Sequence, residues 1–208
     1  MMRAIDELQS LREKRPYHHG DLRAALVAAA LLLIDQRGVK GFTLKDAVRI
    51  AGVSTAAPYR HFADKEALLR SIQKEGFVLF NAALADAYEK GVTPRAKVLE
   101  LGVAYVRFAL EHSAHFRVMF GIGGGEMTGP LGTNANGFLL LVAAVAALHP
   151  DAPGEVKNGL VLACWSVVHG FALLQMDGAI AATVGVHDPE EQLRRILDLM
   201  IATGSHES

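Results

Sequence analysis

Hydrogen-bond donors and small side chains are concentrated in the stretch 43–65, TLKDAVRIAGVSTAAPYRHFADK. Tyr59, His61 and Lys65 are donors of the kind that hold phosphate oxygens in protein–DNA complexes. An arginine such as Arg60 can pair with guanine, and the methyl group of an alanine or threonine can contact the methyl group of thymine. These residue types together predict contact with double-stranded DNA.

Two helices separated by a tight turn should position these side chains. Thr43 and Asp46 have the spacing of a capping box at the start of the first helix, Gly52 ends that helix, and Ser54 is a good N-cap for the second. Such a helix-turn-helix lays its second helix in the major groove, and its use for packing alone is the alternative. The geometry predicts phosphate contacts from Thr43 and Lys45 and base contacts from Thr55, Ala56, Ala57 and Arg60.

The stretch 42–69, FTLKDAVRIAGVSTAAPYRHFADKEALL, closely resembles the N-terminal DNA-binding domain of TetR-family transcriptional regulators. The resemblance covers residues 19–69 and combines a preceding helix, the helix-turn-helix, its YxHF ending and the DKEALL start of the next helix. Ala47-Val48 departs from the family, which usually has a bulky residue followed by alanine, and Pro58 replaces the usual leucine or phenylalanine. Because a first helical turn tolerates proline, Pro58 bears on the shape of the recognition helix and not on its existence.

The resemblance implies how the protein works. Regulators of this family are homodimers whose two heads bind the half-sites of a palindromic operator, with Tyr59, His61 and Lys65 holding the backbone. In the family the last two long helices, here about 154–177 and 189–203, form a four-helix dimer bundle. A small effector binds in the C-terminal body, favours a form with the wrong head spacing and releases the DNA. The implied function is a ligand-responsive regulator, most commonly a repressor, and no cofactor is implied.

Composition and charge agree with a two-part chain. The 208 residues are 51% hydrophobic with a net charge of −1, enough for a sizeable core and for surplus apolar surface at an interface or cavity. A helical core rich in alanine and leucine is the alternative source of that composition. Residues 1–75 hold 13 Lys and Arg against 9 Asp and Glu, whereas the rest of the chain is net acidic. A basic head on an acidic body suits a protein that binds DNA at one end.

The sequence predicts a cytoplasmic protein that does not span a membrane. Cys164 is the single cysteine, so no intramolecular disulfide can form and a reducing compartment is expected. The first ten residues, MMRAIDELQS, lack the apolar core of a signal peptide. The uncharged run 159–176 reaches the length of a membrane span, but it stands alone, and a buried helix of a helical bundle is the better interpretation.

Helical spacing of apolar residues recurs along the chain, with no alternating strand pattern, and predicts an all-α fold of about nine helices. We expect a flexible basic arm at 1–18, a three-helix helix-turn-helix DNA-binding domain at 19–64, and a helical ligand-binding and dimerisation domain at 65–208. A loosely ordered tail is the alternative for the arm. The expected helices besides those of the helix-turn-helix cover about 20–36, 65–90, a helix from 94, a short piece at 115–122, 138–148, 154–177 and 189–203.

Trp165, His169 and Gly170 form a WxxxHG pattern that resembles one C-terminal subgroup of the family. Trp165 and His169 share a helical face, so they could line a pocket for an apolar or aromatic effector. The alternative is that Trp165 is core and His169 a hydrogen-bonded buried histidine. The predicted lining is Phe108, Phe116, Met119, Phe120, Trp165, His169 and Met176. The glycine-rich stretch 121–137 is either a loop at the pocket entrance or a plain connector.

Two other classes of function compete with the regulator. An enzyme needs a nucleophile with a base or a metal cluster, but Cys164 lies in an apolar run typical of an inert thiol. His112 and His115 lack the further ligands that a metal site needs, so we predict no enzyme and no metal. The other alternative is a constitutive or partner-controlled DNA-binding protein without an effector. A ligand cavity in the body would favour the sensor, and a filled core the constitutive protein.

Overall fold

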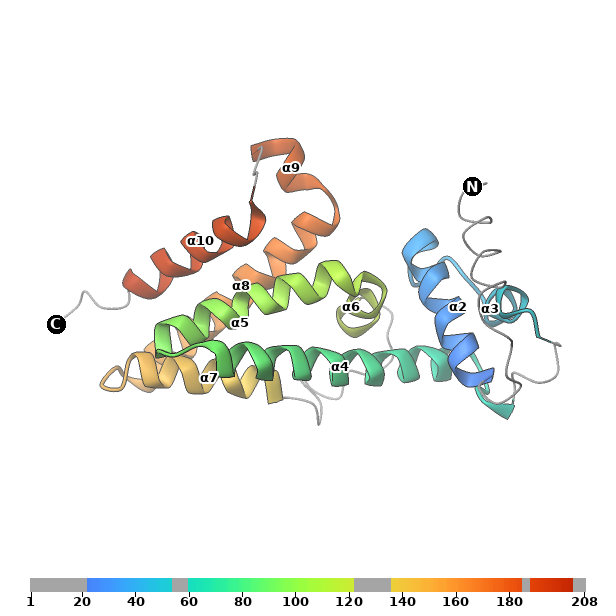
Figure 1. Cartoon of the computed structure of the whole chain (residues 1–208), viewed down its shortest axis with the longest axis horizontal. Coiled ribbons are helices and arrows are strands. Elements are labelled where there is room, and N and C mark those ends of the chain that lie inside the picture. The colour runs from blue at the N-terminus through green and yellow to red at the C-terminus, as the bar shows by residue number, and fades with distance from the viewer. Residues whose placement is uncertain (1–21, 54–59, 122–135, 185–187, 204–208) are drawn as a thin grey trace.

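A computed structural model of the chain describes residues 22–53, 60–121, 136–184 and 188–203. The described part is helical without strands, which confirms the predicted all-α class. It is elongated: a head near the N-terminal end and a larger body are joined by one long helix (Figure 1). The helices are α2 (Leu22–Arg37), α3 (Leu44–Ala51), α4 (Lys65–Lys90), α5 (Pro94–Glu111), α6 (Ser113–Phe120), α7 (Asn136–Leu148), α8 (Gly154–Met176), α9 (Ala179–Val184) and α10 (Pro189–Thr203).

Local capping fixes where α3 and α4 begin. The Asp46 amide donates to Thr43 Oγ1 over 3.3 Å and the Thr43 amide donates to Asp46 Oδ2 over 2.9 Å, which completes the predicted capping box. The Thr43 hydroxyl and the Thr43 amide both donate to the Asp46 carboxylate and hold its pKa below the usual value. Gly52 ends α3 in the left-handed region with φ 70°, and Asp64 accepts from the Ala67 amide at the start of α4.

Helix α4 belongs to two hydrophobic cores. Its first half places Leu68, Leu69 and Ile72 in the core of the head, together with α2 and α3. Its second half places Phe80 and Leu84 in the core of the body. The prediction that the two cores share this helix is therefore confirmed. A displacement of α4 in one core also moves the residues that α4 contributes to the other core. The domain boundaries drawn at residues 18 and 64 stay predictions.

Two features differ from expectation. The short helix α9 was not predicted, because six apolar and small residues without a capping pattern give too little periodic signal. Helix α8, expected to be buried, is long and apolar enough to cross a membrane by length and composition, yet only 28% of its most apolar window is buried within the chain. One side of α8 packs on the body while the other carries exposed leucines, including Leu162 and Leu174.

Three ion pairs join α5 to α10. Arg95 pairs with Asp198, Glu100 with Arg194 and Arg107 with Glu190. The half-buried Glu100–Arg194 pair is bidentate, with N–O distances of 2.8 and 3.2 Å. The Arg194 guanidinium holds the pKa of Glu100 below its usual value, although partial burial opposes that shift.

We expect Glu100→Gln to lower the free energy of unfolding at neutral pH and to do so less at acidic pH. A carboxylate whose pKa is lower in the folded state contributes stability that is present above its unfolded pKa and is lost as pH falls through the folded value. The difference between wild type and variant should therefore shrink below about pH 4, the range in which glutamate titrates. Urea unfolding across pH measures it, with the exposed Glu89→Gln as the control; a pH-independent difference would contradict the role of the charge.

Candidate DNA-binding surface and ligand cavity

The described part of the predicted DNA-binding surface is exposed. Lys45 on α3 and Arg60 and His61, just before α4, are all solvent-accessible. The Thr43 hydroxyl donates to Asp46 Oδ2 over 2.7 Å, so this side chain positions α3 through the capping box. The remaining predicted contacts, Thr55, Ala56, Ala57 and Tyr59, lie outside the described residues, as does Pro58.

Lys65 ties the start of α4 to the segment that precedes α3. Its Nζ donates to the Phe42 carbonyl oxygen over 2.7 Å and lies 4.4 Å from the centroid of the buried Phe42 ring. An ammonium group has three donors, so the carbonyl leaves two for other acceptors. The contact of Lys65 with a DNA phosphate therefore stays a prediction. The sequence did not indicate the bond to Phe42, which anchors the start of α4.

We expect Lys65→Met to lower the stability of the head by about 1 kcal/mol and to flatten the salt dependence of operator binding. The first effect follows from the lost bond to Phe42. The second follows because each phosphate contact contributes about −0.9 to the slope of log affinity against log salt. Urea unfolding and DNA titrations at several salt concentrations measure the two effects, and Lys74→Met, exposed on α4, is the matched control. An unchanged slope would show that Lys65 acts on DNA only through Phe42.

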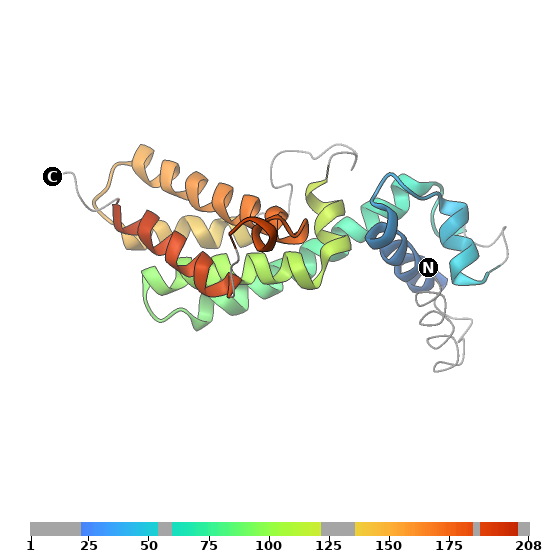
Figure 2. The ribbon, with the colours of Figure 1, turned by 90° about the horizontal axis from the view of Figure 1, so that it is seen from above.

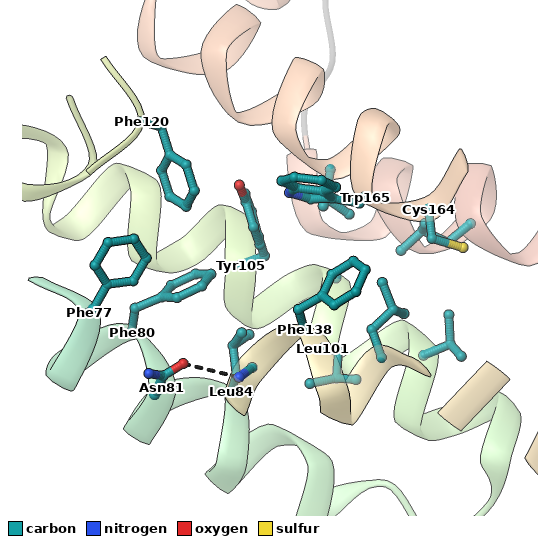
Figure 3. A pocket seen from close by; sticks show the side chains of 16 residues that line it. Phe77, Phe80, Asn81, Leu84, Leu101, Tyr105, Phe120, Phe138, Cys164 and Trp165 are labelled. Carbon is teal, nitrogen blue, oxygen red and sulfur yellow. Dashed lines mark hydrogen bonds between the residues drawn. The ribbon is translucent and has the colours of Figure 1, made fainter. Parts of the chain in front are cut away.

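A cavity lies inside the body, between α4, α5, α6, α7, α8 and α10, and has a volume of about 50 Å³. Aromatic side chains converge on it from several helices (Figure 3). Phe80 contacts the Tyr105 ring edge-to-face at 5.2 Å, and Phe138 contacts Trp165 at 5.7 Å. The lining is Phe77, Phe80, Asn81, Leu84, Val98, Leu101, Gly102, Tyr105, Phe120, Gly137, Phe138, Leu141, Cys164, Trp165, Val168 and Leu197.

The polar atoms at this cavity come from few side chains. Tyr105 Oη lies 2.8 Å from His169 Nδ1, Trp165 carries an indole N–H donor, and Asn81 Oδ1 accepts from the Gly137 amide over 3.0 Å. Burial raises the pKa of Tyr105 and lowers that of His169, so both groups are neutral near pH 7. Burial also raises the pKa of the Cys164 thiol to about 11, which makes this cysteine the unreactive one that the sequence predicts.

The cavity includes two of the seven residues predicted to line a pocket, Phe120 and Trp165. Phe108, Phe116 and Met119 are buried in the core, and Met176 packs against that core. His169 does not line the cavity itself, but it bonds to the Tyr105 hydroxyl and packs against the Phe120 ring at 5.3 Å. The role of all seven in binding a ligand stays a prediction. Phe77, Phe80, Tyr105 and Phe138 were missed, although the apolar positions of α4 and α5 already marked the first three as buried.

Helix α6 connects the cavity to the head. Phe116 and Met119 lie in the core of the body, whereas Ala114 and Val118 of the same helix lie in the core of the head. Ser113 donates to Asp35 on α2 over 2.5 Å. A Cβ on Gly76 of α4 would come within 2.6 Å of the Met119 sulfur, so α4 and α6 are in close contact. A displacement at the cavity wall therefore has two routes to the head, through α4 and through α6.

His115 also lies on α6, between the two cores. It is the buried member of the pair His112 and His115 that the sequence offered as metal ligands. Its Nε2 is 3.5 Å from Glu75 Oε1, and the ring of His112 lies 5.9 Å from its own. Burial lowers the pKa of His115, and Glu75 opposes that shift. Among the described residues, no group of three or more His, Cys, Asp or Glu side chains is placed to hold a metal ion.

Helices α8 and α10 present an apolar face on one side of the body. They lie side by side across it in Figure 2 and contact one another. Leu162 on α8 is 55% exposed and Leu199 on α10 is 70% exposed. Gly159 and Gly170 of α8 face open space, because a Cβ on either would meet no atom within 4 Å. Small residues between leucines allow a second helix to approach closely.

Two family models match the chain. The model of bacterial regulatory proteins of the tetR family matches residues 26–72, and that of the tetracyclin repressor-like C-terminal domain matches residues 98–200. The first match contains α3 and its turn, and the second contains the walls that α5 to α8 contribute to the cavity. The chain therefore belongs to the TetR family of transcriptional regulators, whose members bind DNA through a helix-turn-helix.

Solved structures show the same fold over nearly the whole chain. A protein of unknown function from Rhodococcus sp. RHA1 is 31% identical, with 91% of this chain and 98% of that chain covered and a TM-score of 0.74. A tetR-family regulatory protein from Rhodococcus RHA1 is 19% identical, with coverage of 89% and 98% and a TM-score of 0.67. A single-substitution variant of TetR from Acinetobacter baumannii AYE, in complex with minocycline, is 21% identical, with coverage of 90% and 96% and a TM-score of 0.56. Comparison with curated proteins gives no match.

Proposed function

We propose that this protein is a ligand-responsive repressor that binds a palindromic operator as a homodimer and releases it when a small apolar or aromatic effector enters the cavity. The main support for the proposal is that two helices, α4 and α6, line the cavity and also pack in the core of the head. An effector that binds better when these helices have moved favours a dimer whose heads no longer match the operator. The solved neighbour that holds minocycline supports a small-molecule site in such a fold.

The homodimer is proposed through α8 and α10. An exposed apolar face with small residues, as these helices carry, is what an isologous helical interface requires. Burial of this face in a dimer explains why α8 is long and apolar, so no membrane span is needed to account for its composition. The proposed protein acts in the cytoplasm, where operator DNA is found, and carries out no catalysis.

Fluorescence anisotropy with the DNA upstream of its own gene tests the proposal, with a scrambled duplex as the control. We expect saturable binding that favours the upstream DNA and weakens steeply with salt, because phosphate contacts release counterions. Equal, weak binding to both duplexes would contradict an operator at that site. Selection of binding sites from random DNA would then show whether the recognition helix, with Pro58, discriminates between sequences at all.

The constitutive DNA-binding protein remains the second candidate, favoured by the small cavity. A volume of about 50 Å³ is well below the roughly 300–1,000 Å³ of sites for drug-sized ligands. The sensor therefore requires the cavity to open as the effector enters. Thermal unfolding in the presence of small aromatic compounds separates the two, because only a protein that binds them is stabilised.

A further inference from the structure

The cavity offers no charge to a ligand. Among the described residues that line it, none is Lys, Arg, Asp or Glu. An ionised carboxylate or ammonium brought into this site would lose its hydration without gaining an opposite charge, which is strongly unfavourable. The lining therefore selects against charged effectors and in favour of neutral ones.

The hydrogen bonds at the cavity have a direction. The Trp165 indole N–H can only donate. Neutral His169 can accept at Nδ1, which lies 2.8 Å from the Tyr105 oxygen, and the more acidic phenol is the better donor of the two. Tyr105 therefore donates to His169, and its oxygen keeps lone pairs that can accept a hydrogen bond from a ligand.

A neutral hydroxyl matches these two groups better than other ligand groups. It can accept from the Trp165 N–H and donate to the Tyr105 oxygen at the same time. A carbonyl or ether can accept from Trp165 but cannot donate to the Tyr105 oxygen. A hydrocarbon offers neither contact, although the aromatic walls would still bind its body.

We propose that the effector is an uncharged compound with a small aromatic or apolar body and a hydroxyl group, and that the hydroxyl binds between the Trp165 indole and the Tyr105 hydroxyl. This inference rests on the proposed function of the cavity as the effector site. The small volume of the cavity favours a single substituted ring over a larger body.

Three probes of matched shape test the class: para-propylphenol, propylbenzene and para-propylbenzoate. Trp165 is the only tryptophan of the chain and lines the cavity, so its fluorescence reports binding directly. It is excited at the red edge of its absorption, where the probes do not absorb. We expect the phenol to bind about a hundredfold more tightly than propylbenzene, which lacks the hydrogen bonds to both Trp165 and Tyr105. The benzoate should bind at least about a hundredfold more weakly than the phenol.

Tyr105→Phe removes the hydroxyl and keeps the ring. We expect it to reduce the affinity for para-propylphenol about tenfold, because only the bond from Trp165 is left, and to leave the affinity for propylbenzene unchanged. Tyr88→Phe removes a hydroxyl elsewhere in the body, away from the cavity, and should leave the preference for the phenol intact.

Three results would overturn the inference: a benzoate that binds as tightly as the phenol, a phenol preference that Tyr105→Phe does not reduce, or no binding by any probe. Operator anisotropy on the same samples separates these results from a failure of the proposed function. If the protein binds the operator but prefers propylbenzene or the benzoate to the phenol, the effector class is wrong and the proposed function is not contradicted. Binding of the phenol by a protein that recognises no operator contradicts the proposed function and leaves the ligand chemistry standing.

Discussion

A chain that carries both Leu162→Glu and Leu199→Glu should be a folded monomer that binds operator DNA about a thousandfold more weakly than the wild type. Both leucines are exposed in the single chain, at 55% and 70%, so the substitutions leave its core intact. In the proposed dimer they would bury unpaired carboxylates against their symmetry mates, which is strongly destabilising. A monomer loses the effective concentration that links two half-sites, a factor of about 10²–10⁴.

The control is Leu139→Glu, which adds one carboxylate at an exposed leucine of α7, outside the proposed interface helices α8 and α10. We expect that variant to stay dimeric and to bind the operator as the wild type does. Light scattering after gel filtration gives the mass, circular dichroism confirms that all three proteins are folded, and anisotropy gives the affinity. A doubly substituted chain that remains a dimer would place the interface elsewhere on the body.

The starts of the helices could be predicted because their causes are local. Thr43, Asp64 and Thr93 each cap a helix through the amide three residues on, as their sequence context indicates. The division of α4 between two cores followed from its length and from the spacing of its apolar residues. No such local signal marks α9, and none indicates that Lys65 would bond to the Phe42 carbonyl, a contact across 23 positions.

The cavity could not be located in the same way. Periodicity shows which side of a helix is buried, but a side chain that faces a cavity and one that faces protein have the same pattern. Trp165 and His169 share a helical face, yet Trp165 lines the cavity and His169 contacts only residues of its lining, Tyr105 and Phe120. The difference depends on where α5 lies against α8, which is a property of the assembled body.

Substitution of Phe116 should have the largest effect on stability of any single change proposed. It tests whether this side chain faces the cavity or packed protein. Phe116 was predicted to line a pocket, but its ring is fully buried and contacts Tyr105, Phe120 and His169 at centroid distances of 4.8–5.7 Å. We expect Phe116→Ala to reduce the free energy of unfolding of the body by about 3–5 kcal/mol, because a densely packed site loses a whole ring. Urea unfolding followed by Trp165 fluorescence reports this transition.

The same substitution at Phe77 is the matched comparison. Phe77 is only partly buried and borders the cavity, so its removal takes away fewer contacts and enlarges a space that already exists. We expect Phe77→Ala to reduce the free energy of unfolding by about 1–2 kcal/mol, in the lower part of the range for large-to-small substitutions. Equal losses for the two variants would mean that Phe116 also borders free space. The pocket predicted from the sequence would then extend to Phe116, and the ring would be expected to move aside when an effector binds.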